Sequence, residues 1–288
     1  MSHNYYLSVA GVSILFEADY PLTVNTEFLP FLIEPEATDL HAVIRKTSSM
    51  PQLPSNPIYT DIFCTVAQDA EGNIQKFFFD SADGSYIVST YHTDSACILI
   101  EYPSSYISGT PDLQNCFYCL GFEEYLLRRN KLCLHASCVD TPLGGILFSG
   151  PSGIGKSTQA ELWCQHRGAR LINGDRPILS QEKKEWLAWG SPYAGSSKFY
   201  VNDSCSVAAI VLLKQASTCT LRKLSFAEAF RGVWAGLTIR TWDRAFVEAA
   251  SSLAIELVTT VPVYEFSCTP DEEAAAFLEA ELRKEYKL

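Results

Sequence analysis

Hydrophobic and polar positions follow two different patterns along the chain, and the first pattern is typical of strands. Over residues 1–108, apolar and β-branched residues form short runs such as YYLSVAGVSILFEA, IYTDIFCTVAQ and SACILIEYP. Turn signals such as Glu71-Gly72-Asn73 separate these runs. Short β-branched runs between turn residues indicate strands. Residues 1–108 are therefore predicted to form a β-rich N-terminal domain with an antiparallel sheet.

A helix is predicted to link this domain to the rest of the chain. The segment SSYISGTPD interrupts the strand pattern, and Pro111 and Asp112 favour the start of a helix. The helical periodicity of DLQNCFYCLGFEEYLLRRN runs on to Arg129, whose charge suits the negative end of a helix. We expect one linking helix over residues 109–130.

Strand-like and helix-like segments alternate over residues 131–288. KLCLHASCVD and GGILFSG are predicted to be strands, and KSTQAELWCQHR is predicted to be a helix that Gly168 ends. The terminal PDEEAAAFLEAELRKE has the acidic start and basic end of a helix. Strands mixed with helices around a glycine-rich loop are typical of an α/β fold. The predicted fold class is α/β, with a nucleotide-binding core over residues 131–288.

Composition excludes several classes of function. The net charge of the 288-residue chain is -11, which argues against a broad basic surface for nucleic acid. No run approaches the roughly 18 apolar residues of a membrane span, so neither nucleic acid nor a membrane is an expected partner. The N-terminal segment lacks the basic start of a signal peptide. We therefore expect a cytoplasmic protein whose ten cysteines are reduced.

The segment GPSGIGKS, residues 150–157, fits the pattern G-x-x-x-x-G-K-[ST] of a phosphate-binding loop. Its glycines allow positive φ, and successive backbone N–H groups at a helix N-terminus cradle phosphate oxygens. The lysine neutralises phosphate charge, and the serine hydroxyl reaches Mg²⁺. The alternative is a glycine turn with an exposed lysine. The predicted nucleotide contacts are Gly150, Ser152, Gly153, Ile154, Gly155, Lys156, Ser157 and Thr158.

Residues 134–179, LHASCVD through NGDRPIL, resemble the catalytic core of the HPr kinase/phosphorylase and phosphoenolpyruvate carboxykinase superfamily, in particular its small HPr-kinase-like members. That family has a histidine-bearing strand, a phosphate loop, a helix ending in glycine, and an apolar strand ending in aspartate. His135, residues 150–157, Gly168 and Asp175 match this order. VPVYEFSCTPDEEAAAFLEAEL resembles the family's closing strand and helix.

The resemblance implies use of ATP and Mg²⁺ and phosphoryl transfer to a hydroxyl. It implies that Lys156 and Ser157 bind the nucleotide and the metal. Asp175 is implied to bind the metal or to remove a proton, and His135 to lie near the reacting phosphate. The candidate catalytic residues are thus Asp175, His135 and Lys156, and the candidate metal ligands are Ser157 and Asp175.

Two departures from the family pattern bear on activity. The family has paired aspartates where this chain has NGDR, so Gly174 replaces the first aspartate and Asp175 keeps the second. In relatives, one aspartate of the pair acts on the acceptor and the other on the metal, and this division of labour is open here. The glycine-rich C-terminal signature of true HPr kinases is not found, so HPr is not the expected acceptor.

Three further residues are candidates for substrate contacts. Arg176 is placed either to clamp a phosphate or to pair with an acidic neighbour. The small, polar segment GSPYAGSSKFY, residues 190–200, is either a substrate loop with contacts from Ser191 and Lys198 or a plain connection. The resulting hypothesis is an ATP-dependent kinase whose acceptor is a serine of a peptide or protein, or a small metabolite. The alternative is a nucleotide-binding sensor or pseudokinase-like partner with little turnover. Acceptor identity, ATP or GTP preference and the oligomeric state stay open.

Overall fold

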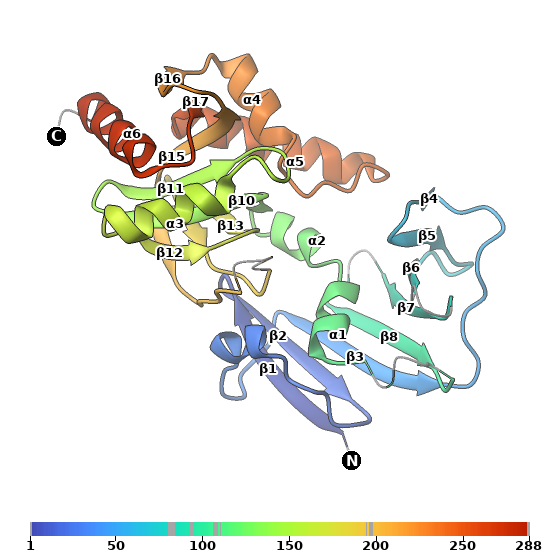
Figure 1. Cartoon of the computed structure of the whole chain (residues 1–288). Coiled ribbons are helices and arrows are strands. Elements are labelled where there is room, and N and C mark those ends of the chain that lie inside the picture. The colour runs from blue at the N-terminus through green and yellow to red at the C-terminus, as the bar shows by residue number, and fades with distance from the viewer. Residues whose placement is uncertain are drawn as a thin grey trace. The chain divides into compact units, whose positions relative to one another are not determined.

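The computed structural model describes residues 2–79, 84–92, 95–105, 109, 111–193, 195 and 198–286 (Figure 1). The chain is mixed α/β with two sheets and divides into two compact units, Met1–Phe122 and Glu123–Leu288. Ser108, the last residue of the predicted N-terminal domain, lies outside the described residues. Within the described residues, no helix combines the length and apolar character needed to cross a membrane.

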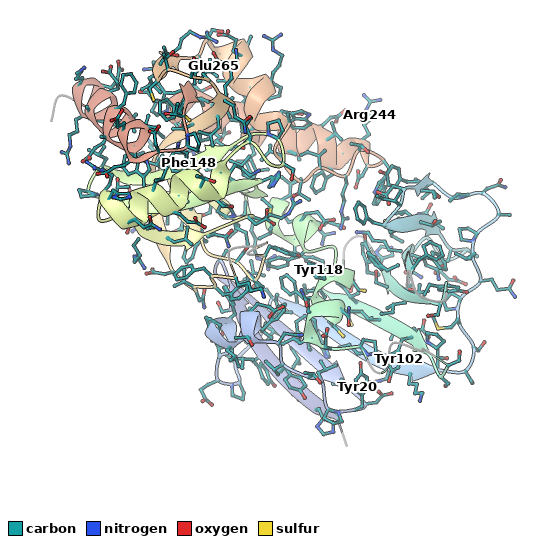
Figure 2. The ribbon with its side chains drawn as sticks, in the orientation of Figure 1. Tyr20, Tyr102, Tyr118, Phe148, Arg244 and Glu265 are labelled. Carbon is teal, nitrogen blue, oxygen red and sulfur yellow. The ribbon has the colours of Figure 1, made fainter. Side chains whose placement is uncertain are left out.

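The first unit holds an eight-stranded sheet in the order β1-β2-β3-β8-β7-β6-β5-β4. The hairpin between β1 and β2 turns at Ala10 and Gly11, which both have positive φ, as a two-residue turn of this kind requires. The strands are β1 (His3–Val9), β2 (Val12–Ala18), β3 (Leu40–Thr47), β4 (Tyr59–Thr60), β5 (Cys64–Gln68), β6 (Ile74–Phe79), β7 (Tyr86–Tyr91) and β8 (Cys97–Pro103). Tyr20 and Tyr102, labelled in Figure 2, pack edge to face with ring centroids 5.3 Å apart.

The expectation of an antiparallel sheet is wrong at the centre of this sheet. Strand β3 pairs in parallel with both β2 and β8. Parallel neighbours need a crossover connection rather than a hairpin. The chain supplies one between β2 and β3 with the 3-10 helix η1 (Thr26–Phe31) and another between β3 and β8 with the four strands β4 to β7. Strand β3 itself was not among the predicted strands.

The predicted single helix over residues 109–130 is also corrected. The segment forms two short helices, α1 (Leu113–Cys119) and α2 (Phe122–Leu127). The predicted start holds, because the Asp112 carboxylate caps α1 by accepting a hydrogen bond from the Asn115 amide at 2.8 Å. Gly121 separates the helices with a φ of +64°, a left-handed conformation that ends a helix.

The second unit holds a nine-stranded sheet built around the long strand β15. β15 pairs in parallel with β11 on one side and β17 on the other, so the carboxyl ends of these three strands meet at one edge. In parallel α/β sheets this edge is where ligands bind. The strands are β9 (Lys131–Cys133), β10 (Ala136–Thr141), β11 (Gly144–Ser149), β12 (Arg170–Asn173), β13 (Ile178–Glu182), β14 (Glu185–Trp189), β15 (Ser204–Gln215), β16 (Thr220–Lys223) and β17 (Val263–Cys268).

Helices cover both faces of this sheet through two separate hydrophobic cores. Residues alternate along β11, so that Leu147 joins one core while Ile146 and Phe148 join the other. The first core includes α4 (Phe226–Trp234) and α5 (Arg244–Thr260); the second includes α3 (Lys156–His166) and α6 (Glu272–Glu285). Phe148, labelled in Figure 2, lies 6.3 Å from the Trp163 ring of α3 between centroids. This packing fixes α3 against β11, and therefore fixes the loop that joins them.

Candidate functional site

The glycine-rich loop runs from the end of β11 into α3. β11 ends at Ser149, and α3 begins at Lys156 with Gly155 as its N-cap. Gly150, Gly153 and Gly155 have φ values of +142°, +77° and +114°. Side-chain-bearing residues rarely adopt such values, so these glycines permit a path that other residues would strain.

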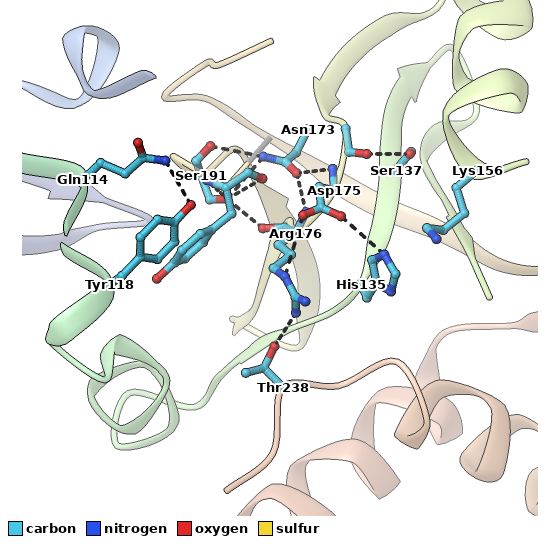
Figure 3. A network of polar contacts seen from close by, with 12 residues as sticks. Gln114, Tyr118, His135, Ser137, Lys156, Asn173, Asp175, Arg176, Ser191 and Thr238 are labelled. Atoms are coloured by element: carbon cyan, nitrogen blue, oxygen red, sulfur yellow. Dashed lines mark hydrogen bonds and ion pairs between the residues drawn. The ribbon is translucent and has the colours of Figure 1, made fainter. Parts of the chain in front are cut away.

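Lys156 is buried at the start of α3 and is only 8% exposed. Its ammonium donates hydrogen bonds to the carbonyl oxygens of Gly150 and Pro151, each at 3.2 Å, and points toward His135 and Asp175 in Figure 3. Burial lowers the pKa of Lys156, and the Asp175 carboxylate opposes this change. The alternative of an exposed surface lysine is therefore wrong.

His135 and Asp175 form a pair beside this lysine. His135 lies between β9 and β10, and Asp175 follows β12. The His135 Nε2 atom is 3.3 Å from Asp175 Oδ1 (Figure 3). Burial lowers the pKa of His135, the Lys156 charge lowers it further, and the Asp175 carboxylate opposes both. The imidazole is therefore neutral near pH 7.

Three hydrogen bonds to main-chain groups hold this pair in place. The Ala136 amide donates to the carbonyl oxygen of Asp175 at 2.9 Å, which ties the two segments together. The His135 amide donates to the Gly236 carbonyl at 2.8 Å, and the Ser149 hydroxyl donates to the His135 carbonyl at 2.9 Å. Because these bonds involve main-chain groups, the site geometry is built into the fold.

Asn173 is a positioning residue that the sequence reasoning missed. It is fully buried at the end of β12, and its Oδ1 atom accepts hydrogen bonds from the amides of Asp175 and Arg176 at 2.9 and 2.7 Å. Its Nδ2 atom donates to the carbonyl and hydroxyl oxygens of Ser191, each at 3.2 Å. An Asn whose side chain binds the amide two residues later is the signature of an Asx turn, so the NGD sequence carried a signal.

Replacing Asn173 with alanine is expected to destabilise the protein by about 2–4 kcal/mol, because the partly buried amides of Asp175 and Arg176 would both lose their acceptor. Urea unfolding of the variant measures this loss. The exposed Asn202→Ala is the matched control and should change stability by about 0.5 kcal/mol or less. Equal effects of the two substitutions would contradict the role of Asn173.

The three candidate substrate residues have different surroundings. Arg176 lies beside Asp175, with its Nε atom 3.7 Å from Asp175 Oδ2, and its Nη1 atom donates to the Thr238 hydroxyl at 2.9 Å. Ser191 is fully buried, and its hydroxyl donates to the Arg176 carbonyl at 2.7 Å. Lys198 is exposed with a φ of +50° and has no polar partner within the described part of the chain.

The segment 190–200 reaches the site through a glycine. Gly195 has a φ of +53°, and a Cβ atom built there would lie 2.9 Å from the Cβ of Asp175. No side chain fits at such a distance, so this glycine permits the segment to pack directly on the carboxylate. Ala194, Ser196 and Ser197 lie outside the described residues.

The candidate catalytic and metal-binding residues line a pocket of about 260 Å³ at the carboxyl edge of the sheet, and the candidate substrate residues Arg176, Ser191 and Lys198 are outside its lining. Lys156, His135 and Asp175 all line it, as do five other residues of the loop region and Gly174. The lining residues are His135, Ser152, Gly153, Gly155, Lys156, Ser157, Thr158, Gly174 and Asp175. Among the predicted nucleotide contacts, Gly150 and Ile154 are outside this lining, and Ile154 packs against the core next to α3.

Metal-ligating side chains are sparse within the described residues, where no group of three or more His, Cys, Asp or Glu side chains is placed to hold an ion. Ser157 and Asp175, the two candidate metal ligands, both line the pocket. Mg²⁺ at phosphate sites usually takes its other ligands from phosphate and water.

The site can also be tested through proton linkage at His135. Between the ordinary histidine pKa of about 6.5 and the lowered pKa in the folded chain, the unfolded chain binds more protons. Stability should therefore fall as the pH drops through this window. Urea unfolding at about pH 7.5 and about pH 5.5 measures the fall, which should be smaller in His135→Gln than in the wild type. His166→Gln is the control, and an unchanged pH dependence in His135→Gln would contradict this prediction.

Comparison with known proteins gives a distant structural likeness and no match of sequence. No family model matches the chain, and no curated protein matches its sequence. The HPr(Ser) kinase/phosphatase from Coxiella burnetii matches in structure with a TM-score of 0.33 and 16% identity, over 54% of this chain and 90% of that one. At this distance the chemistry of the chain has to be inferred from its own residues.

Proposed function

We propose that this protein is an ATP-dependent phosphotransferase that moves the γ-phosphate to a hydroxyl group. One observation supports this most directly: the buried ammonium of Lys156 and the His135–Asp175 pair line the same pocket. A cation for phosphate and a proton acceptor for a hydroxyl are thus available together. Phosphoryl transfer depends mainly on such positioning and electrostatics.

The loop and the start of α3 fit a polyphosphate. The first N–H groups of a helix have no intrahelical acceptor, so those of α3 are available to phosphate oxygens. The glycines at 150, 153 and 155 permit close approach of the backbone, and the Lys156 ammonium supplies positive charge. These residues would hold the β and γ phosphates of ATP.

Ser157 and Asp175 fit Mg²⁺, because both line the pocket and both supply oxygen ligands. Bound Mg²⁺ would neutralise phosphate charge. Two protein ligands suffice, since this ion ordinarily keeps waters and takes phosphate oxygens for the rest of its coordination.

Asp175 is the proposed acceptor of the hydroxyl proton. As the acceptor oxygen bonds to the γ-phosphorus, the bond between that phosphorus and the ADP oxygen breaks, and ADP leaves with the electron pair. The proton taken by Asp175 passes to the neutral His135 Nε2, 3.3 Å away, and then to solvent. Arg176 places a positive charge beside Asp175 and is held there by Thr238.

Calorimetric titration of Mg·ATP into the full chain tests the proposal. We expect saturable binding, followed by acceptor-dependent release of ADP. If neither Mg·ATP nor Mg·GTP binds, the proposed function is wrong.

A nucleotide-binding sensor with little turnover is the second candidate. Gly174 occupies the position where the resemblance implies the first aspartate of the pair, and Asp175 is the one carboxylate in the described lining of the pocket. In a kinase, Asp175 would therefore have to bind the metal and also accept the proton of the hydroxyl group. Nucleotide binding without phosphate transfer to any acceptor would favour the sensor.

A further inference from the structure

A second cavity, of about 440 Å³, adjoins the pocket that contains Lys156 and Asp175. Ser157 and Gly174 line both spaces. A molecule bound in this second cavity would therefore lie directly beside the proposed reacting groups. We call it the α3–β12 cavity, because its walls come mainly from α3 and from residues 169–171 at the start of β12.

The walls of the α3–β12 cavity are mostly apolar. Ala160 and Cys164 contribute from α3, Leu171 contributes from β12, and Phe199 closes the wall from the segment 190–200. The Cys164 and Leu171 side chains are half-buried, so each still presents surface to the cavity. Concave sites with apolar walls and few polar groups are typical of small-molecule binding. Such walls suit a ligand with an apolar body.

The charges around this cavity disfavour an anion. Arg170 is the one cation among its described lining residues, and its guanidinium is already bonded to Asp203 at 2.6 Å and Asp140 at 3.2 Å. Glu161, on the first turns of α3, is exposed and has no ion-pair partner within the described part of the chain. Because Asp203 and Asp140 already neutralise Arg170, the Glu161 carboxylate is the charge that a ligand in this cavity would meet, and it repels carboxylates and phosphates.

A third cavity, of about 360 Å³, adjoins the other side of the pocket. It shares Gly153, Gly155 and Thr158 with the pocket, and it reaches Gln215 at the end of β15 and Thr269 after β17. The loop therefore separates two flanking spaces. His135 and Asp175 lie on the side of Gly174, which lines the α3–β12 cavity and not the third one. If the γ-phosphate of a bound nucleotide faces Asp175, the nucleoside would lie in the third cavity. The α3–β12 cavity would then be open to the acceptor.

We infer that the α3–β12 cavity binds the phosphoryl acceptor, and that this acceptor is a small alcohol with an apolar body and no negative charge. The inference rests on the proposed phosphotransferase function and gives it a substrate class. A protein serine loop would present a polar backbone to the apolar walls, and an acidic metabolite would face Glu161. An amino alcohol instead matches both the walls and this carboxylate.

Three probes that share one aromatic body separate these possibilities. Phenylalaninol is cationic, 2-phenylethanol is neutral and 3-phenyllactate is anionic. Binding to the full chain, measured by saturation-transfer NMR without nucleotide, should be strongest for phenylalaninol and at least tenfold weaker for 3-phenyllactate. Cys164→Phe should fill the cavity and abolish binding of all three. Glu161 is exposed, so Glu161→Gln should leave folding intact. It should weaken the binding of phenylalaninol roughly two- to fivefold and leave the binding of 2-phenylethanol unchanged.

The outcomes separate this inference from the proposed function. Equal binding of phenyllactate and phenylalaninol, no binding of phenylalaninol, or phenylalaninol affinity that Glu161→Gln leaves unchanged would each overturn the acceptor class. Those results would leave Mg·ATP binding at Lys156 untouched. Selective phenylalaninol binding by a chain that fails to bind Mg·ATP would overturn the phosphotransferase and the acceptor role together.

Discussion

Asp175→Asn is expected to reduce phosphoryl transfer by about a thousandfold while the protein still folds and binds nucleotide. Asparagine keeps the size of the side chain, but it neither accepts the hydroxyl proton nor carries the charge that the metal needs. General-base catalysis alone contributes roughly 10²–10⁴-fold. The loss should appear in kcat more than in KM for ATP, because Lys156 and the loop still hold the phosphates. Acceptor-dependent release of ADP measures it.

The control for this substitution is Glu256→Gln, which removes an exposed carboxylate of α5 outside the described lining of the pocket. This variant should turn over like the wild type. Unfolding of both variants in urea checks that neither change acts through stability. If Asp175→Asn turned over as fast as the wild type, the proposed role of Asp175 in catalysis would be wrong.

Lys156→Ala is expected to weaken Mg·ATP binding by roughly 30- to 100-fold. The ammonium lies at the pocket between the carbonyls of Gly150 and Pro151, and a charged hydrogen bond contributes about 1.5–3 kcal/mol. The substitution also removes the cation that accompanies the loop amides, so the β and γ phosphates lose their strongest partner. Calorimetric titration of Mg·ATP into wild type and variant measures the change.

Lys223→Ala is the matched control, because Lys223 is an exposed lysine of β16 outside the described lining of the pocket. It should bind Mg·ATP with wild-type affinity. Since the Lys156 ammonium also bonds the loop, thermal unfolding of Lys156→Ala should accompany the titration. A folded Lys156→Ala protein that binds Mg·ATP as tightly as the wild type would show that the nucleotide site lies elsewhere.

The substitutions Asp175→Asn and Lys156→Ala together distinguish the proposed kinase function from the alternative of a nucleotide-binding sensor. A kinase loses turnover in Asp175→Asn and nucleotide affinity in Lys156→Ala. A sensor shows the second effect with no turnover in the wild type. The ADP measurement on the wild type with phenylalaninol as acceptor therefore has to precede any interpretation of the Asp175 variant.

Local sequence features predicted the central elements of the second unit. The apolar run GGILFSG contains β11, and KSTQAELWCQHR contains α3 with its C-cap Arg167. The glycines of the loop have the positive φ values that their pattern predicts. Helix α3 buries Lys156 and Gln159 along with Ala160 and Trp163, at the spacing of one helix face. Strand alternation, helix spacing and glycine geometry are local properties, which is why a short stretch of sequence contains them.

Strand partners were less predictable than the strands themselves. Hairpins such as β1–β2 follow from a local turn, but β3 pairs in parallel with two strands from distant parts of the chain. The choice of such partners depends on which buried faces pack together, and no local pattern encodes it. The prediction of a single linking helix was wrong for a simpler reason, because Gly121 adopts a left-handed conformation and ends α1.

The sequence by itself determined the loop, the helix behind it and the residue types available for phosphate chemistry, because these follow from local spacing and glycine conformation. Only the tertiary structure decided that His135 and Asp175 lie 3.3 Å apart, and that Asn173 and Gly195 hold and cover the aspartate. It also decided that the α3–β12 cavity, with its apolar walls and the exposed Glu161, adjoins the pocket that contains Lys156 and Asp175. Those arrangements join segments far apart in the chain, and they exist only once strand pairing and the two cores have brought the segments together.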